Sequence, residues 1–189
     1  PRAEVAAERV EEVITCPTSI NDPASPKLPA ASAPRGELTF RDVSFQYPDA
    51  RADVISGVNF TTHAGQMLGI IGSTGSGKST LVQLIPRLYD ATEGTVRVGG
   101  RDVRGYDVNA LRDAVGIVLQ KNLLFSGTIR DNLKWGDPDA TDDDLWAACR
   151  AARADEFLSR MPDGLDTDLG QGGCNVSGGQ KQRLCIART

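Results

Sequence analysis

The first 36 residues change abruptly from a helical pattern to a proline-rich one. Apolar residues recur at helical spacing among glutamates and arginines, which predicts a helix over residues 1–15. These apolar positions are Ala6, Val10, Val13 and Ile14. Residues 16–36 are rich in proline, whose ring disfavours helix, so an extended linker is expected there. Its prolines are Pro17, Pro23, Pro26, Pro29 and Pro34.

The apolar pattern that follows predicts strands. Residues 38–61 are expected to form antiparallel β structure. Short continuous apolar runs at 67–71 and 115–119 are typical of buried strands and predict a largely parallel sheet. After the first of these runs, Leu81 and Leu84 recur at helical spacing, so a strand, a loop and a helix follow in that order.

Helical patterns dominate the last third of the chain. They are clearest at 145–152 and 155–161, and they indicate a helical subdomain at about 121–179. The chain is therefore predicted to have an α/β core with an antiparallel β subdomain and a helical subdomain.

Composition narrows the class without identifying a function. The 189 residues carry a formal net charge of −4, which argues against a dedicated nucleic-acid binder with a basic face. No apolar run reaches the length that a membrane crossing needs, and the N-terminus lacks the pattern of a secretion signal. The 4 cysteines are scattered without a metal-ligand pair, so reduced thiols are expected.

A glycine-rich loop after the run 67–71 carries the first chemical signal. It matches every fixed position of the pattern G-x-x-x-x-G-K-[ST], in which backbone N–H groups surround the phosphates of a nucleotide. Lys78 would contact the outer phosphates and Ser79 would bind Mg²⁺, while the dipole of the following helix faces the phosphates. A chance glycine-rich linker is disfavoured by the flanking strand and helix. The candidate residues are Gly72, Ser73, Thr74, Gly75, Ser76, Gly77, Lys78, Ser79 and Thr80.

A second motif lies near the end of the chain. Ser177 is a candidate N-cap and Gln180 stands three residues later, as in a capping box. The run Ser177, Gly178, Gly179 and Gln180 resembles the signature motif of ATP-binding cassette (ABC) ATPases, with Val176 where leucine is usual. The resemblance implies that these residues close over ATP held by a second ATPase domain, in a homo- or heterodimer.

Three further segments resemble parts of ABC exporters. Tyr47 resembles the aromatic residue that stacks on adenine, and Gln120 resembles the Q-loop glutamine that reaches Mg²⁺ and the attacking water. Residues 123–133 and 169–173 resemble exporter segments that follow the Q-loop and precede the signature. The metal ligands implied by the resemblance are Ser79 and Gln120.

The resemblance implies the ATP-binding and ATP-hydrolysing domain of an ABC exporter, with ATP and Mg²⁺ as cofactors. Residues 1–15 would end a helix linked to transmembrane domains, 16–36 would be the linker, and 37–189 would be a partial ABC domain. The implied partners are those transmembrane domains at the cytoplasmic face of the cell membrane and a second ATPase domain, with no nucleic acid. The chain stops at Thr189, inside the signature helix, so the Walker B aspartate, catalytic glutamate and switch histidine are expected beyond it. His63 does not match the switch.

Two alternatives stay open at this point. One is a soluble ABC ATPase that acts on nucleic acid or ribosomes. The other is a regulatory ABC subunit that binds ATP without hydrolysing it.

An acidic cluster near residue 141 has a structural interpretation. Thr141 is a good N-cap, and aspartates in the first turn of a helix are stabilised by its dipole, so capping is favoured over a metal site. Trp135 and Trp146 are expected to be packing residues. The aspartates are Asp137, Asp139, Asp142, Asp143 and Asp144.

Overall fold

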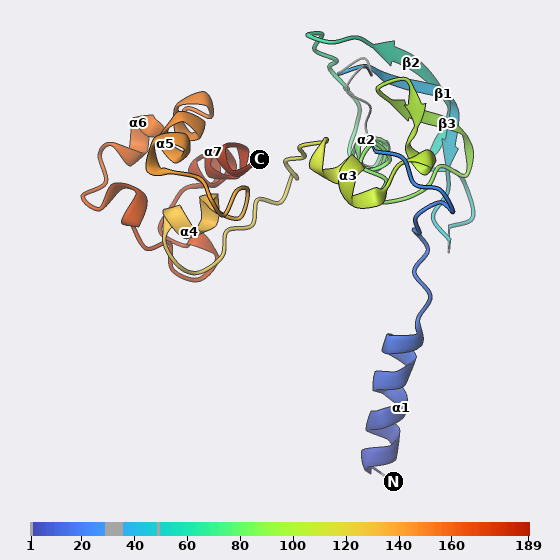
Figure 1. Ribbon diagram of the computed structural model, residues 1–189, viewed down its shortest axis with the longest axis horizontal. Coiled ribbons are helices and arrows are strands. Elements are labelled where there is room, and N and C mark those ends of the chain that lie inside the picture. Colours follow the sequence, from blue (N-terminus) through green and yellow to red (C-terminus); the bar gives the residue numbers. More distant parts are fainter. Residues whose placement is uncertain (1, 29–35, 49) are drawn as a thin grey trace. The chain divides into compact units, whose positions relative to one another are not determined.

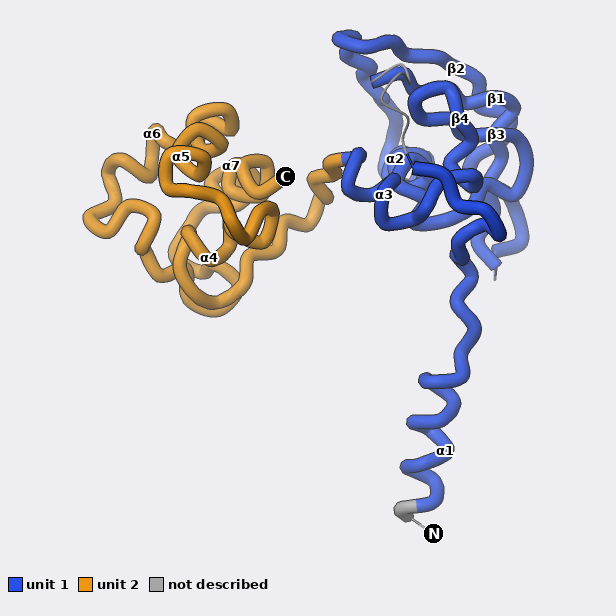
Figure 2. Tube along the Cα trace, in the orientation of Figure 1, with its two compact units in different colours: residues 1–115 blue, residues 116–189 orange. Residues whose placement is uncertain are grey.

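The computed structural model describes residues 2–28, 36–48 and 50–189 (Figure 1). The chain divides into two compact units, residues 1–115 and residues 116–189 (Figure 2).

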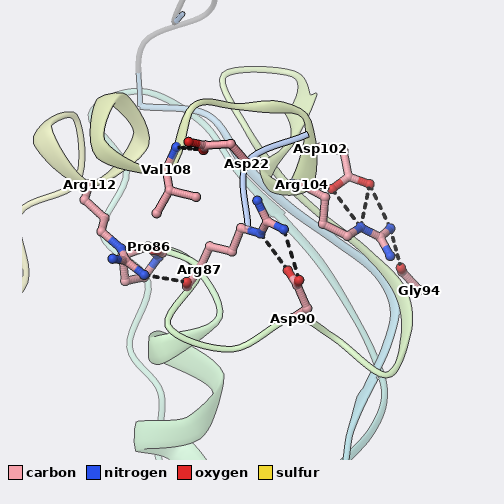
Figure 3. A network of polar contacts seen from close by, with 9 residues as sticks. All are labelled: Asp22, Pro86, Arg87, Asp90, Gly94, Asp102, Arg104, Val108 and Arg112. Carbon is pink, nitrogen blue, oxygen red and sulfur yellow. Dashed lines mark hydrogen bonds and ion pairs between the residues drawn. The ribbon is translucent and has the colours of Figure 1, made fainter. Parts of the chain in front are cut away.

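The predicted N-terminal helix is confirmed as α1, Arg2–Thr15. The part of the linker that the structure describes is not a free tether. The backbone N–H of Lys27 donates to the carbonyl of Gly105 at 3.2 Å, and Asp107 N–H donates to the carbonyl of Lys27 at 3.1 Å. The carboxylate of Asp22 accepts a hydrogen bond from the backbone of Val108 at 2.8 Å (Figure 3). Pro29 and Pro34 of the predicted linker lie outside the described residues.

The first unit contains an antiparallel sheet in the order β2-β1-β3-β4. The antiparallel structure predicted over 38–61 is confirmed by β1 (Leu38–Phe45) and β2 (Ile55–Thr62). The sequence analysis did not predict β3 (Glu93–Val98) or the short β4 (Arg101–Asp102).

A bulge in β1 depends on a glycine in the neighbouring strand. Asp42 has a left-handed backbone with φ of 49°, and the register between β1 and β3 shifts there. Gly94 also has a positive φ of 77°, and a Cβ on it would collide with the carbonyl oxygens of Arg41 and Asp42. Only glycine fits this close approach of two backbones.

The core of the first unit lies between the sheet and the segments that follow the glycine-rich loop. These are α2 (Lys78–Gln83), the 3-10 turn η1 (Val103–Gly105) and α3 (Val108–Asp113) (Figure 1). Burial of apolar side chains from both layers stabilises this packing. The most deeply buried members are Phe40, Val43, Leu84, Val96 and Leu111.

A buried arginine organises the connection between α2 and β3 (Figure 3). Arg87 is only 6% exposed and pairs with both carboxylate oxygens of Asp90, at 2.8 and 3.1 Å. Its backbone is left-handed, with φ of 53°, and its carbonyl accepts a hydrogen bond from the guanidinium of Arg112 at 3.0 Å. This network joins the end of α2 to α3.

The prediction of two parallel strands was wrong. Residues 67–71 and 115–119 are not strands in the structure, and Met67 and Ile71 are both 98% exposed. A strand exists only as part of a hydrogen-bonded ladder, and neither segment pairs with another strand in the described part of the chain. The largely parallel sheet is therefore not formed among these residues.

The second unit is helical. Its main helices are α4 (Ile129–Leu133), α5 (Asp142–Ala151), α6 (Asp155–Leu158) and α7 (Gly178–Arg188). The 3-10 turns η2 (Gly164–Asp166) and η3 (Gln171–Gly173) precede α7. The helix predicted at 145–152 is confirmed by α5, whereas the helix predicted at 155–161 ends at Leu158. The core of this unit includes Ile129, Leu133, Leu145, Cys149, Leu158, Leu169 and Leu184.

Capping boxes start α4, α5 and α7 of the second unit. Those at Thr141 and Ser177 confirm the predicted caps, and a third at Thr128 was not predicted. The hydroxyl and backbone N–H of Thr141 donate to the carboxylate of Asp144 and lower its pKa. No cluster of three or more potential metal ligands is present among residues 2–28, 36–48 and 50–189. Of the acidic residues near Thr141, Asp144 completes the capping box and Asp142 pairs with the guanidinium of Arg130.

The cysteines and tryptophans occupy different environments. All four cysteines are free thiols, and burial raises the pKa of Cys149 to about 11, so this thiol stays neutral. Trp146 packs against the core as predicted. Trp135 also packs against another side chain, stacking on Phe125 at a centroid distance of 4.5 Å, but it is 67% exposed and lies outside the core.

None of the helices in the described ranges combines the length and apolar character required to cross a membrane.

Candidate functional site

The glycine-rich loop has a backbone that only glycine readily adopts. Gly75 and Gly77 have positive φ values of 83° and 81°. A Cβ on Gly77 would lie 2.8 Å from the carbonyl oxygen of Val54, so a side chain there would collide with the backbone of the neighbouring segment. The loop therefore combines left-handed turns with close backbone packing, which exposes N–H groups on its concave side.

Lys78 brings a positive charge to this loop. Its ammonium donates hydrogen bonds to the carbonyls of Gly72 and Ser73, at 2.8 and 2.7 Å, and to the hydroxyl of Ser76 at 3.3 Å. Lys78 is the first residue of α2, so the helix fixes the base of its side chain. The loop thus holds a half-buried cation against its own polar atoms, the arrangement that a polyanion can bind.

An aromatic cluster lies beside the start of α2. The hydroxyl of Tyr47 is 3.1 Å from that of Thr80, which is buried. The Tyr47 ring makes edge contacts with Phe45 and Tyr89, at centroid distances of 4.8 and 5.3 Å. Tyr47, a predicted site residue, therefore lies beside α2, the helix that follows the glycine-rich loop. The sequence analysis missed Tyr89, for which the only signal was an aromatic residue shortly after the helix.

A cavity of about 280 Å³ adjoins the loop. Its lining combines mostly apolar residues of β2 and the residue before it with Ile70, Ile71 and the loop, including Lys78. The loop therefore borders a space beside its lysine.

In the second unit, the start of α7 presents unshielded backbone donors. The hydroxyl of Ser177 accepts a hydrogen bond from Gln180 N–H at 3.3 Å, and the Gln180 amide oxygen accepts one from Ser177 N–H at 2.8 Å. Gly178 and Gly179 are exposed, and nothing lies within 4 Å of where their Cβ atoms would be. An 11-residue helix with such an open N-terminus favours an anion electrostatically.

The predicted site residues are distributed over both units. Tyr47, Thr80 and the glycine-rich loop belong to the first unit, where the structure brings them together. Gln120 and the residues of the Ser177 cap belong to the second unit, and Gln120 is exposed.

Asn132 holds the segment that follows Gln120 and was not predicted as a site residue. Its side chain, which is only 2% exposed, accepts a hydrogen bond from Phe125 N–H at 2.8 Å. Its amide nitrogen donates to the carbonyls of Phe125 and Thr128, at 2.9 and 3.0 Å. One buried amide therefore satisfies both backbone groups of Phe125, as a neighbouring strand would.

Asn132→Leu should destabilise the second unit. The change removes the partner of the Phe125 N–H and carbonyl groups, and a backbone group that loses its partner away from water costs about 1–3 kcal/mol. We expect the free energy of unfolding to fall by roughly 2–4 kcal/mol, measured by thermal unfolding of the intact protein. Asn109→Leu, at an exposed position on α3, is the matched control and should change stability little. Equal melting temperatures for the two variants would contradict this role of Asn132.

The glycine-rich loop, with the ammonium of Lys78 bonded to its carbonyls, is typical of P-loop nucleotide-binding domains. The capped helix α7 with its two exposed glycines is a second, separate feature. The family model described as "ABC transporter" matches residues 55–189. The chain belongs to the ABC transporter family.

The proteins that resemble this chain include ABC exporters. The chain is 47% identical to an uncharacterized ABC transporter ATP-binding protein of Mycobacterium tuberculosis, over 100% of this chain and 32% of that protein. It is 43% identical to a putative multidrug export ATP-binding/permease protein of Bacillus subtilis, over 96% of this chain and 31% of that protein. The chain thus spans about a third of the length of these relatives.

A solved structure of a bacterial Atm1-family ABC exporter with ATP bound resembles the whole chain. The TM-score is 0.90 with 34% sequence identity, over 100% of this chain and 32% of that one. These comparisons confirm the predicted fold class and the resemblance to the ATP-binding domain of exporters. Domains of this family bind ATP and generally use Mg²⁺.

Proposed function

We propose that this chain binds Mg-ATP at residues 72–80 and supplies the ATPase activity of an ABC exporter. The observation that carries the proposal is the ammonium of Lys78, which lies within 2.7–2.8 Å of two carbonyls of the glycine-rich loop. A triphosphate would offer this cation stronger acceptors than carbonyls. The loop N–H groups would bind the phosphates at the same time.

The residues of the loop fit both cofactors. The Ser79 hydroxyl is exposed at the start of α2 and is a suitable oxygen ligand for Mg²⁺, with Gln120 as the second proposed ligand. When bound, Mg²⁺ would neutralise charge on the phosphates. Tyr47 would contact the adenine. We assign ATP hydrolysis to the intact protein, in which Gln120 would also position the attacking water.

The open N-terminus of α7 supports a dimeric arrangement. Ser177, Gly178, Gly179 and Gln180 would bind the phosphates of ATP held by a second ATP-binding domain. The pair could be two copies of this chain or two related chains. We place both domains at the cytoplasmic face of a membrane. The reason is that the Bacillus subtilis relative is about three times as long as this chain, and its name includes both an ATP-binding part and a permease part.

The proposal is tested by transport in membrane vesicles that contain the intact protein. We expect ATP-dependent accumulation of a lipophilic dye in inside-out vesicles and ATP hydrolysis that the dye stimulates. Stimulation by ribosomes or RNA instead of the membrane substrate would contradict export and favour a soluble ABC ATPase. ATP binding without any hydrolysis would favour a regulatory subunit.

An exposed aromatic pair supports docking to the transmembrane domains. Phe125 and Trp135 are 46% and 67% exposed and stack with an interplanar angle of 15°. Exposed apolar surface of this kind often marks an interaction site.

Trp135→Asp should uncouple transport from ATP binding. The carboxylate would place a charge in the docking surface, so we expect about a tenfold or greater loss of dye transport, on the scale of 1.4 kcal/mol per tenfold. ATP affinity should not change, because Trp135 belongs to the second unit and the glycine-rich loop to the first. Trp135→Phe keeps the stack and is the control. Normal transport by Trp135→Asp would exclude this surface.

A further inference from the structure

The segment that leads into the Ser177 cap is a closed loop rather than a simple connection. Its base is fixed to α4, because Leu169 N–H donates to the carbonyl of Gly127 at 2.9 Å and Asp168 forms a β-bridge with Thr128. The side chain of Asn175 donates to the carbonyl of Asp168 at 2.6 Å, which ties the end of the loop to its beginning.

The tip of the loop is held by a side chain from α7. The ammonium of Lys181 donates a hydrogen bond to the carbonyl of Gly172 at 2.8 Å. Gly173, beside it, is buried with φ of 67°, and a Cβ there would lie 3.4 Å from Cε of Lys181 and 3.2 Å from a methyl group of Leu124. The lysine stem therefore packs over the glycine while its charged end reaches the carbonyl.

The tip is also connected to the cap. Val176 N–H donates to the carbonyl of Gly173 at 3.3 Å, and Val176 is buried immediately before Ser177. Lys181 N–H in turn donates to the carbonyl of Ser177 at 2.9 Å. Lys181 thus contacts Gly172 through its side chain and Ser177 through its main chain.

The position of Lys181 is not explained by the stability of α7 alone. It lies four residues after the cap, where the helix dipole disfavours a positive charge. Its ammonium has no ion pair with a carboxylate in the described ranges of the chain. The same charge would favour an anion at that end of the helix.

We propose that Lys181 is a positioning residue for the signature site. Through its hydrogen bond to Gly172 it holds the loop Gly170–Gly173, and with it the Ser177 cap, in the conformation that meets the phosphates of a second domain. The inference rests on the proposed function, since it concerns the trans-acting role given above to Ser177–Gln180.

Lys181→Met tests this role because methionine keeps the apolar stem and removes the ammonium. In the intact protein, ATP binding by the loop 72–80 should be unchanged. The ATP concentration for half-maximal dimerisation should rise about tenfold, the size expected for losing a hydrogen bond from a charged donor. Lys181→Arg keeps a charged donor and should restore dimerisation. Gln182→Met, at the exposed neighbouring position, is the matched control.

Amide hydrogen exchange provides a second measurement in the folded protein. Lys181→Met should speed exchange in residues 169–177 and leave α5 unchanged. Unchanged exchange in that segment, unchanged dimerisation, or a defect that arginine does not restore would each overturn the inference. Ser177→Arg separates the two proposals. Normal dimerisation of Ser177→Arg would remove the proposed signature role itself. If Ser177→Arg fails to dimerise while Lys181→Met dimerises normally, only the role of Lys181 is removed.

Discussion

Lys78→Ala is expected to abolish most of the ATP affinity of the intact protein. The substitution removes the ammonium that the structure places against the carbonyls of Gly72 and Ser73. Hydrogen bonds to a charged group contribute about 1.5–3 kcal/mol each, so ATP should bind about 10- to 100-fold more weakly. Isothermal titration with Mg-ATP measures the effect, and ATPase activity should fall with it.

A control separates the loss of this contact from a general loss of charge. Lys121→Ala removes an exposed lysine in the second unit and should leave ATP affinity unchanged. Wild-type affinity in Lys78→Ala would remove the assignment of residues 72–80 as the nucleotide site. A loss of affinity in both variants would also contradict a specific role for Lys78.

Ser177→Arg is expected to block ATP-driven dimerisation while leaving ATP binding by each domain intact. Ser177 is exposed at the start of α7, and the adjacent Gly178 and Gly179 leave the backbone open. A large side chain at the cap would fill the space that the phosphates of the second domain need. Light scattering with saturating Mg-ATP should show monomeric domains, or in the intact transporter a loss of nucleotide trapping.

The substitution also removes a helix cap, which typically costs about 1 kcal/mol. Thr141→Arg is the matched control, because Thr141 forms the same kind of capping box at the start of α5. This control should lose a similar amount of stability and still dimerise. Normal dimerisation of Ser177→Arg in light scattering would contradict the trans-acting role of the signature residues.

Local features of the candidate site were largely readable from the sequence. The caps at Thr141 and Ser177 formed as predicted because each joins residues only three apart. The glycines of the glycine-rich loop likewise encode their own backbone conformation. The chemistry assigned to these residues stays a prediction, to be decided by the experiments above.

Features that need a distant partner were predicted less well. The apolar run 67–71 has the composition of a buried strand, but no described strand pairs with it. Asn132 gave no signal in the sequence, because its importance depends on the backbone of Phe125 lying beside it in the folded chain. The expectation that Trp135 packs did not say that it packs at the surface, since hydrophobicity alone does not tell an inward side chain from an outward one.

The sequence by itself determined the family-specific motifs, the antiparallel start of the fold and the beginnings of its helices, because short-range spacing and backbone preferences fix them. Only the tertiary structure decided that Asp22 and Lys27 dock the linker onto residues 105–108, and that Lys181 reaches back to Gly172. Each of these contacts has a backbone group on at least one side, and every residue other than proline carries both a donor and an acceptor there. Their partners are therefore selected by geometry rather than by residue type.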